Sequence, residues 1–481
     1  MNWRMSHALA PVCLSLMACS PSSAEPHRDV IFVVLDTVRA DAIGPDAPRP
    51  TSPQFNAIAE AGAWFTDATI SSSWTWPAHA TLFTGRPPWE HGAHFAASGE
   101  LSSIRNGFPA LRKDLPTLAE VMGAAGYETV SLSANCLLAE ELGLTRGFSQ
   151  AQCLDKPGEV EREAASIIQK DRQGPLFLFI NLMPAHAPYS LTQTRWARPH
   201  APQLEPETAP DWVVPYLVKN PPGVDLQLRQ TPQSLTGVQK LLSGQLSIPE
   251  EGWTMLRDLY DGEVLEADLR LNRIMSLWTQ QFPTGIVAVT SDHGEALGEQ
   301  NRVDHRGSVY APITHVPLAL AAPGIIQAGT KINAPIQMDD LPATILALSG
   351  LPDSALGGTS MLDTMDETST RPKSRIIRAV AWPDPYRATA LGGEFADVVQ
   401  LIRDGELVLI SSSSGVHQVF DLESDPLMLT DIADQQAAWM EDHLALLLSP
   451  TVLQAEDSMS AGESTPSAEV TERLRALGYI Q

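Results

Sequence analysis

The chain has 481 residues, of which 43% are hydrophobic, and this is enough for a large packed core. At roughly 150 residues per domain, the length fits about three domains or one large α/β enzyme with a small appendage. Acidic residues number 57 against 32 basic ones, so the formal net charge is −25. These values exclude a disordered, collagen-like or coiled-coil chain, and the negative charge opposes binding along a nucleic-acid backbone. We therefore expect no nucleic-acid partner.

The N-terminus has the pattern of an export signal. Arg4 precedes an apolar run, residues 8–18, that is too short to cross a membrane as a mature helix. The run ends in Leu-Met-Ala before Cys19 and resembles a bacterial lipobox, in which the cysteine carries lipid after cleavage. Residues 1–18 are then a lipoprotein signal peptide, and a plain secretory signal cleaved near Ala24 is the alternative. Cys19 predicts an exported protein of the bacterial cell envelope, anchored by lipid to a membrane at its periplasmic face.

Four short apolar runs predict strands buried on both faces of a sheet, because they are rich in β-branched residues and do not alternate with polar ones. They are residues 29–35 (DVIFVVL), 176–182 (LFLFINL), 285–290 (GIVAVT) and 316–321 (VPLALA). Helical patterns lie between them, notably residues 52–61 before Gly62 and the three-to-four periodicity of residues 253–278. Strands that alternate with helices predict a doubly wound α/β sheet.

Two further regions differ in composition from the predicted sheet. Residues 199–250 are rich in proline and polar side chains, which indicates a surface insertion or lid within a catalytic domain over residues 28–372. Residues 373–481 contain the strand-like runs IIRAVAW, VVQLI and ELVLI, and we expect a C-terminal subdomain with a small antiparallel sheet and a final helix. Cys136 and Cys153 can pair in an oxidising compartment or stay free, and their spacing does not decide between the two.

Polar side chains follow three of the predicted strands. Asp36 comes directly after the first strand, His186 shortly after the second, and Asp292 and His293 after the third. Because the carboxyl ends of strands line the site in such sheets, we expect two carboxylates and an imidazole to converge there. Such ligands outline a divalent metal site. The alternative for the segment around Asp292 is an ordinary loop with a helix cap.

A candidate nucleophile lies in the segment SSSWTWPAHATLFTG, residues 71–85. Pro77 is favoured at the first position of a helix, so Thr75 is predicted just before a helix start. The unpaired N–H groups and positive dipole end of that helix favour an anion near Thr75. The alternative is a buried threonine near an ordinary helix start.

Six blocks, in order, resemble those of the sulfatase family within the alkaline phosphatase superfamily. They are DVIFVVLDTVRADAIG, TSPQFNAIAEAGAWFTDA, WTWPAHATLFTG, NLMPAHAPY, TSDHGEALGE followed by His305 and HVPLALAAPG, and VFDLESDP with LRALGYI. The resemblance runs from about residue 28 to the C-terminus and is weakest at residues 199–250. It implies an alkaline phosphatase/sulfatase-like fold, with a doubly wound mixed sheet flanked by helices and a small C-terminal antiparallel sheet plus helix.

The nucleophile block departs from the family pattern. Family sulfatases carry Cys or Ser with Pro two residues on and Arg four residues on, and the Cys or Ser is converted to formylglycine. The residues here are Thr75, Pro77 and His79, and threonine is not a substrate for that conversion. The block resembles instead that of superfamily members that use threonine, such as lipoteichoic acid synthases and phosphoethanolamine transferases, whose threonine attacks a phosphodiester.

The residues at the predicted metal-ligand positions also differ from those of family sulfatases. A second family aspartate after the first strand is Thr37 here, and the asparagine that often follows the later aspartate is His293. The resemblance implies that Asp36, Thr75, Asp292 and His293 hold one divalent ion. Because an imidazole replaces a hard oxygen donor, manganese or zinc is favoured, with magnesium or calcium possible.

Three further histidines belong to the predicted site. His186 and His305 match family positions that touch the transferred group or protonate the leaving oxygen, so each is a candidate general acid or an orienting hydrogen-bond partner. They could help to hold a second metal, but no aspartate precedes His186 at the matching place, which favours one ion. His79 is predicted either to support Thr75 or to pack inside the helix.

These residues predict a metal-dependent phosphodiesterase or phospho-group transferase that acts on an anionic ester through Thr75. A sulfate-ester hydrolase that uses unmodified Thr75 is one alternative. A catalytically silent binding lipoprotein that retains the fold is another. The sequence gives no indication of the oligomeric state.

Overall fold

The structure is a computed structural model that describes residues 27–95, 111–140, 143–156, 158–189, 195–204, 210–213, 237–365, 375–384, 387–388, 393–453, 467, 468 and 471. The predicted signal peptide, Cys19, much of the predicted insertion and most of the predicted final helix lie outside these residues. Within these ranges, no helix combines the length and the apolar character that a membrane crossing needs.

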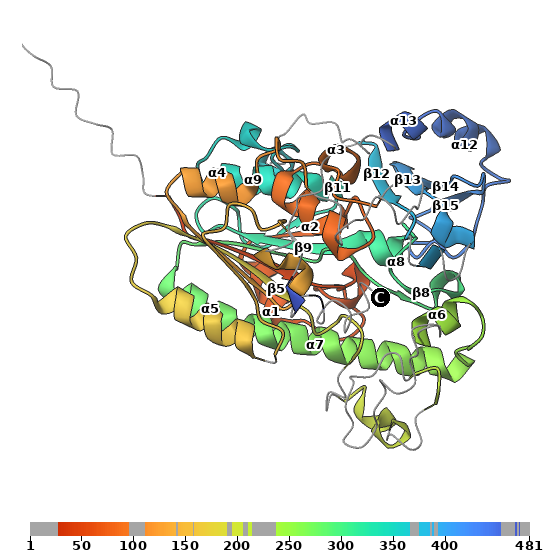
Figure 1. The fold of residues 1–481 in the computed structure, drawn as a ribbon, viewed down its shortest axis with the longest axis horizontal. Helices are drawn as coiled ribbons and strands as arrows, with labels where there is room; N and C mark the ends of the chain where they lie inside the picture. The colour runs from red at the N-terminus through yellow and green to blue at the C-terminus, as the bar shows by residue number, and fades with distance from the viewer. Residues whose placement is uncertain are drawn as a thin grey trace, which may run out of the picture.

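A nine-stranded mixed sheet runs through the centre of the molecule (Figure 1). The order across it is β10 (Thr330–Ile332), β2 (Ala63–Thr69), β9 (His315–Ala321), β6 (Ile286–Thr290), β1 (Val30–Leu35), β5 (Leu176–Leu182), β3 (Glu128–Ser133) and β4 (Gln150–Cys153), and β11 (Ile336–Gln337) also pairs with β2. The strands from β6 to β4 are parallel to one another, whereas β9 is antiparallel to both of its neighbours. The carboxyl ends of β1, β3, β5 and β6 therefore meet at one edge.

The sheet is buried on both faces, as the unbroken apolar runs predict. In β1 all six residues have no exposed surface. Phe32 and its alternate neighbours belong to one hydrophobic cluster, and Ile31 and its alternate neighbours belong to the other. The alternation follows from the two-residue period of a strand.

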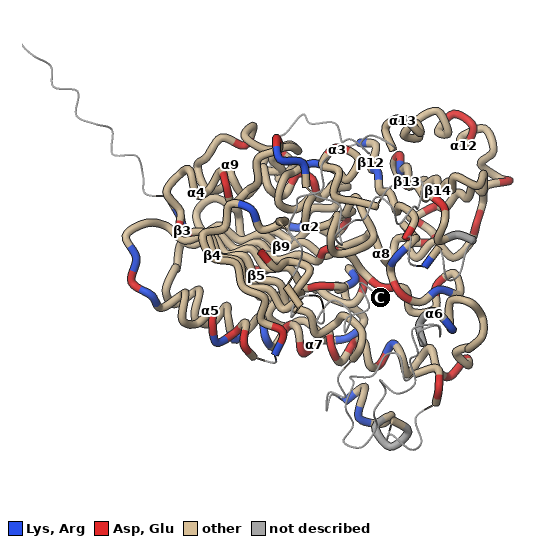
Figure 2. The backbone as a smooth tube through the Cα atoms, viewed as in Figure 1, with Lys and Arg blue, Asp and Glu red and all other residues tan. Residues whose placement is uncertain are grey.

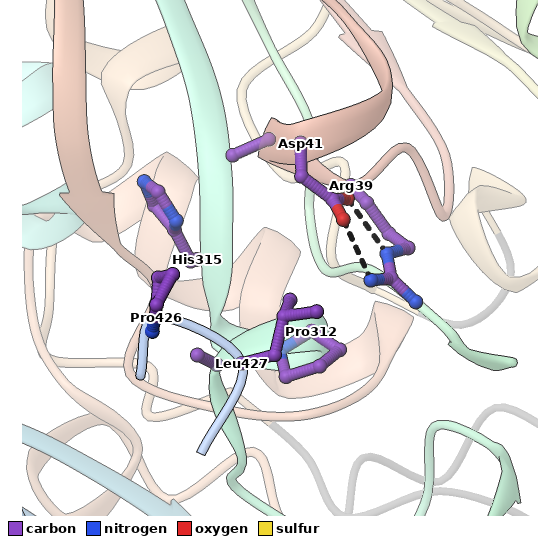
Figure 3. A pocket seen from close by; sticks show the side chains of 8 residues that line it. Arg39, Asp41, Pro312, His315, Pro426 and Leu427 are labelled. Atoms are coloured by element: carbon purple, nitrogen blue, oxygen red, sulfur yellow. Dashed lines mark hydrogen bonds and ion pairs between the residues drawn. The ribbon is translucent and has the colours of Figure 1, made fainter. Parts of the chain in front are cut away.

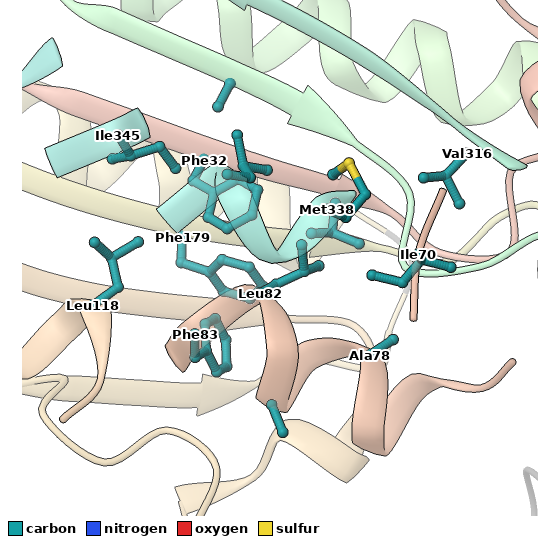
Figure 4. Packing of buried hydrophobic residues seen from close by; sticks show 14 of the residues in the cluster. Phe32, Ile70, Ala78, Leu82, Phe83, Leu118, Phe179, Val316, Met338 and Ile345 are labelled. Atoms are coloured by element: carbon teal, nitrogen blue, oxygen red, sulfur yellow. The ribbon is translucent and has the colours of Figure 1, made fainter. Parts of the chain in front are cut away.

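Helices cover the two faces of the sheet (Figure 1). One face carries α2 (Thr75–Thr84), α4 (Leu118–Ala124) and α9 (Leu341–Leu348). The other carries α1 (Pro53–Ala61), α5 (Glu159–Gln169) and the long α7 (Glu250–Gln281). Figure 4 shows Phe83 and Leu82 of α2 packed near Phe32 and Phe179 of the sheet, and the rings of Phe83 and Phe179 meet edge to face with centroids 4.9 Å apart. Shorter helices are α3 (Pro88–His91), α6 (Gly237–Leu242), α8 (Ala311–Thr314), α10 (Leu362–Met365) and α13 (Pro450–Leu453).

Helix α2 begins one step earlier than predicted. Its first residue is Thr75, so Thr75 lies in the first turn rather than before it. Pro77 is third in the helix, where its missing N–H costs nothing because the first N–H groups of a helix have no intrahelical acceptor. Gly85 ends the helix with φ of 66°, a left-handed conformation that favours glycine.

The C-terminal region contains the predicted small antiparallel sheet. It consists of β12 (Ile377–Ala381), β13 (Val399–Asp404), β14 (Leu407–Ser412) and β15 (His417–Asp421). Helix α12 (Ala437–Leu444) packs on it through Trp439, Met440 and Leu444. The guanidinium of Arg403 donates to both carboxylate oxygens of Asp67 at 2.6 and 2.7 Å and so ties β13 to β2 of the large sheet.

A disulfide and several salt bridges link elements of the catalytic region to one another. Cys136 and Cys153 form a disulfide that links the 3-10 helix η3 (Cys136–Leu138) to β4. On the helical face below the sheet, acidic and basic positions are interspersed along α5 and α7 (Figure 2). Arg273 of α7 pairs with Glu161 of α5 at 3.5 Å and so connects the two helices. Exposed pairs of this kind contribute little to stability, about 0–1 kcal/mol.

Candidate functional site

The site lies where the parallel strands end. Asp36 follows β1, and Asp292 and His293 follow β6, its hydrogen-bonded neighbour. Ligand atoms of these three residues all lie within 4.8 Å of one another, and all three side chains are fully buried. The structure therefore brings together the predicted carboxylates and imidazole.

Hydrogen bonds fix the orientation of both carboxylates. Oδ1 of Asp36 accepts the Thr37 hydroxyl at 2.9 Å. Oδ1 of Asp292 accepts the backbone N–H groups of Thr37, at 3.2 Å, and His293, at 3.0 Å. Thr37 has φ of 65°, and this left-handed backbone makes the chain turn sharply after β1. The second family aspartate is thus replaced by a residue that supports both remaining carboxylates.

The candidate nucleophile adjoins this cluster. The hydroxyl of Thr75 lies 3.4 Å from Nε2 of His293. The other ring nitrogen of His293, Nδ1, lies 2.9 Å from the carbonyl of Gly294, a geometry in which Nδ1–H donates. That tautomer leaves the Nε2 lone pair for a metal. All four predicted metal ligands therefore gather at one place.

His79 lies one helical turn after Thr75 in α2 and contacts this cluster. Its Nδ1 lies 2.9 Å from the backbone carbonyl of Thr75 and 3.5 Å from Oδ2 of Asp292, and its ring is fully buried. The predicted support for Thr75 and the alternative of packing inside the helix both apply, because the ring also meets Phe83 and Phe179 with centroids 5.9 Å away.

Two buried carboxylates lie side by side in this cluster and repel each other when both are charged. A bound cation would offset that repulsion. Burial, and then repulsion from Asp36, raise the pKa of Asp292 to about 8. For Asp36, burial alone would raise the pKa, but His186, His293 and the Asn135 hydrogen bond outweigh it, so the pKa is lowered. A divalent ion would allow both groups to ionise together. Oδ2 of Asp292 supports this interpretation, because it is buried and has no hydrogen-bond partner among the described residues.

His186 and His305 lie beside the cluster. The ring of His305 is 4.2 Å from that of His293 and 5.6 Å from that of His186, measured between centroids. Burial lowers the pKa of both histidines, well below the usual range for His305, so both favour the neutral form.

Residues that the sequence analysis did not identify hold His305. Nδ1 of His305 lies 3.3 Å from Oε2 of Glu295 and 3.5 Å from Oδ1 of Asp304. Asp304 pairs in turn with Arg387, which comes from the C-terminal region. Glu295, Asp304 and His305 also form a second group that could hold a metal. Because Arg387 already occupies Oδ2 of Asp304, the cluster around Asp36 is the better cation site.

Two asparagines are the other residues missed. Asn135 donates to Oδ2 of Asp36 at 2.9 Å, and Asn181 donates to the same oxygen at 3.1 Å. The sequence contains a signal for Asn181, since it is the one polar residue in the apolar run 176–182. Asn135 has no comparable signal, because nothing in its local pattern distinguishes it from a turn residue.

An ion pair follows Asp36 closely in the chain. Arg39 and Asp41 pair at 2.8 Å beside a small pocket that Pro312, His315, Pro426 and Leu427 also line (Figure 3). Arg39 also pairs with Glu299 at 2.7 Å. None of the predicted site residues lines this pocket.

Comparison with known sequences gives one consistent result. A family model described as Sulfatase matches residues 28–351. Arylsulfatase K of Xenopus laevis is 25% identical over 457 residues, which cover 87% of this chain and 81% of that protein. Arylsulfatase K of Danio rerio is 24% identical over 424 residues, which cover 80% of this chain and 76% of that protein.

Comparison with solved structures supports the fold. A protein solved in complex with its substrate D-glucosamine-2-N,6-O-disulfate superimposes with a TM-score of 0.64 at 16% identity, covering 91% of this chain and all of that chain (100%). A phosphonate monoester hydrolase of Agrobacterium radiobacter superimposes with a TM-score of 0.62 at 18% identity, covering 90% of this chain and 97% of that chain. Both share the mixed sheet architecture described above.

Proposed function

This chain belongs to the sulfatase family, whose enzymes are metal-dependent, and from that premise we propose that it cleaves phosphoesters with Thr75 as the nucleophile. Its general activity is that of a sulfatase-like hydrolase of ester bonds. The finer assignment, to a phosphodiesterase or phospho-group transferase, depends on the site. The observation that carries it is the position of an unmodifiable threonine hydroxyl 3.4 Å from Nε2 of His293, beside two buried carboxylates.

The residues present fit one divalent cation. Asp36, Thr75, Asp292 and His293 would hold it, and manganese or zinc suits this mixture of carboxylate, hydroxyl and imidazole, with magnesium or calcium as further candidates. When bound, the ion supplies positive charge that favours ionisation of a coordinated hydroxyl and offsets charge on the ester oxygens. Such a charge would compensate Oδ2 of Asp292, which is buried and has no hydrogen-bond partner among the described residues.

Thr75 and the histidines then take part in different steps of the reaction. Oγ1 of Thr75 attacks phosphorus, and a phospho-threonine forms as the bond to the leaving oxygen breaks. His186 or His305, neutral in the resting site, takes up the proton that leaves the Thr75 hydroxyl and delivers it to that leaving oxygen, a contribution of about 10² to 10⁴ fold. Water, or an acceptor alcohol in a transferase, then attacks phosphorus and releases Thr75. The start of α2 favours the negative charge that develops near Thr75.

Sulfate-ester hydrolysis by unmodified Thr75 is the second candidate. The relatives named arylsulfatase K and the disulfated substrate of a structural neighbour favour it. The phosphonate monoester hydrolase among the structural neighbours shows that the same fold is also compatible with phosphorus chemistry. In both candidates the substrate is an anionic ester.

Parallel rate measurements separate the two candidates. Purified protein is stripped of metal, reloaded with manganese, zinc, magnesium or calcium, and assayed on an aryl phosphodiester, an aryl phosphomonoester and an aryl sulfate. We expect the phosphodiester to react fastest with manganese or zinc. A sulfate ester that reacts faster with every ion would overturn the phosphoester assignment.

We also propose that the chain is exported and held at the periplasmic face of a membrane by lipid on Cys19. The support is the sequence alone, in which a basic residue, a short apolar run and a small-residue tripeptide precede that cysteine. An anchor of this type needs no membrane-spanning helix.

A further inference from the structure

Both oxygens of Asp36 are engaged by neighbouring donors. Oδ1 accepts the hydroxyl of Thr37, and Oδ2 accepts the side-chain amides of Asn135 and Asn181. All four side chains have no exposed surface. Water therefore does not compete for these hydrogen bonds.

The number of donors distinguishes the two oxygens of each carboxylate. A carboxylate oxygen offers two lone pairs. Two amides fill Oδ2 of Asp36, whereas Thr37 leaves one lone pair on Oδ1. In Asp292, two backbone N–H groups fill Oδ1, and Oδ2 is left without a hydrogen-bond partner among the described residues. One oxygen of each aspartate thus remains able to bind an ion.

We propose that Asn135 and Asn181 are positioning residues that make Oδ1 of Asp36 the metal-binding atom and hold this carboxylate in place before the ion arrives. The inference rests on the metal site of the proposed function. Neutral amides suit the task because they donate hydrogen bonds without adding positive charge. An arginine or lysine in their place would pair with Asp36 and repel the cation.

The fold fixes both amides from independent directions. Asn181 belongs to β5 and lies opposite Val34 of β1, the strand that ends just before Asp36. Asn135 follows β3, and its own Oδ1 accepts the backbone N–H of Leu137 at 3.0 Å, so it caps η3. The next residue, Cys136, is bonded to β4 through the disulfide. Each amide therefore reaches Asp36 from a rigid segment.

Manganese binding to the metal-free protein tests the proposal without relying on turnover. The affinity is measured from the electron paramagnetic resonance signal of free Mn²⁺ for the wild type, Asn135→Ala, Asn181→Ala and the control Asn272→Ala, whose side chain is exposed on α7. We expect each of the first two changes to weaken Mn²⁺ binding about tenfold, as loss of a partner to a metal ligand does elsewhere. The Mn²⁺ concentration for half-maximal rate should rise by the same factor, and the control should match the wild type.

The outcomes separate this inference from the proposed function. A wild type that binds none of the four candidate ions would remove the proposed metal site and this inference with it. A wild type that binds Mn²⁺ together with asparagine variants of undiminished affinity would overturn only the positioning role. Thermal melting without metal reports whether each variant folds, and one folded variant suffices because both amides act on the same oxygen. If neither variant folds, the amides are structural and the proposal is wrong.

Discussion

Thr75 is the residue on which the two candidate reactions agree, and its removal should affect chemistry more than structure. We expect Thr75→Ala to lose nearly all turnover while keeping the fold and much of the metal affinity, since one of four ligands is lost. Thr75→Ser should retain part of the rate because the hydroxyl survives. Rates are compared with Thr279→Ala, a change at an exposed position of α7 that should leave turnover unchanged.

Mass spectrometry of protein quenched during turnover identifies the transferred group on the peptide that contains Thr75. A phosphodiester substrate should leave a phosphoryl group that still carries one alcohol, whereas a sulfate ester should leave a sulfuryl group. Wild-type rates in Thr75→Ala would show that water attacks directly and would end the covalent mechanism.

Asp292 offers a different test, because its carboxylate is unfavourable without a cation and required with one. Burial and the charge of Asp36 raise the pKa of Asp292 to about 8, so near pH 7 the metal-free protein holds this carboxyl mostly in the neutral form that asparagine imitates. We expect this variant to melt at the same or a higher temperature than the wild type without metal, and to bind Mn²⁺ at least about 100-fold more weakly. Asp363→Asn, at an exposed position, is the control. An active Asp292→Asn enzyme with full metal occupancy would contradict the metal site.

At the scale of elements, one buried carboxylate joins α7 to the start of α1. Asp268 accepts the backbone N–H groups of Gln54, at 2.9 Å, and Phe55, at 2.8 Å. Burial raises its pKa to about 6, above the value near 3.8 of an unfolded chain. The folded protein therefore binds this proton more tightly. The resulting stability is fully present below about pH 4 and is lost as the pH rises through 6.

We expect the free energy of unfolding of the wild type to fall relative to that of Asp268→Asn by about 2–3 kcal/mol between pH 4 and pH 7, since one pKa unit corresponds to about 1.4 kcal/mol. Urea unfolding at several pH values measures the difference. Asp353→Asn, at an exposed position, controls for general effects of charge. A difference that does not change with pH would show that the carboxyl is not destabilised by burial.

The elements that the sequence predicted well are those whose buried residues form a clear apolar pattern. The strand at residues 176–182 has the bounds that its apolar run indicates, and α1 ends at Ala61 before Gly62. Helix α7 is longer than residues 253–278 because its ends are polar and carry no periodic signal. The antiparallel position of β9 was not predicted, because pairing depends on which strands meet in space rather than on local pattern.

The same distinction applies to the site. The spacing of strands and polar residues, with the family resemblance, predicted Asp36, Thr75, Asp292 and His293 as metal ligands, and the structure brings all four together. Some of the partners that orient them are sequence neighbours, such as Thr37, but others lie far away in sequence. Asn135 is 99 residues from Asp36, and no local pattern records a hydrogen bond across that distance.

At the scale of the whole molecule, the proposed lipid anchor on Cys19 would decide where the enzyme works. We expect Cys19→Ala to release the protein from membranes into the soluble periplasmic fraction with unchanged specific activity, because the acylated residue is the only attachment proposed. Cys13→Ala, within the predicted signal, should remain membrane-bound. Fractionation followed by immunoblotting and assay measures both, and equal membrane association of Cys19→Ala and the wild type would contradict the lipoprotein assignment.

The bidentate pair between Arg403 and Asp67 has a consequence for how the protein is made. The two residues are 336 positions apart, so the pair cannot form until nearly the whole chain has left the ribosome. The pairing of Asp304 with Arg387 imposes the same order on the support of His305. Contacts of such long range slow folding and leave apolar strands unprotected meanwhile. We therefore expect the growing chain to depend on chaperones, and the active site to be among the last parts of the molecule to assemble.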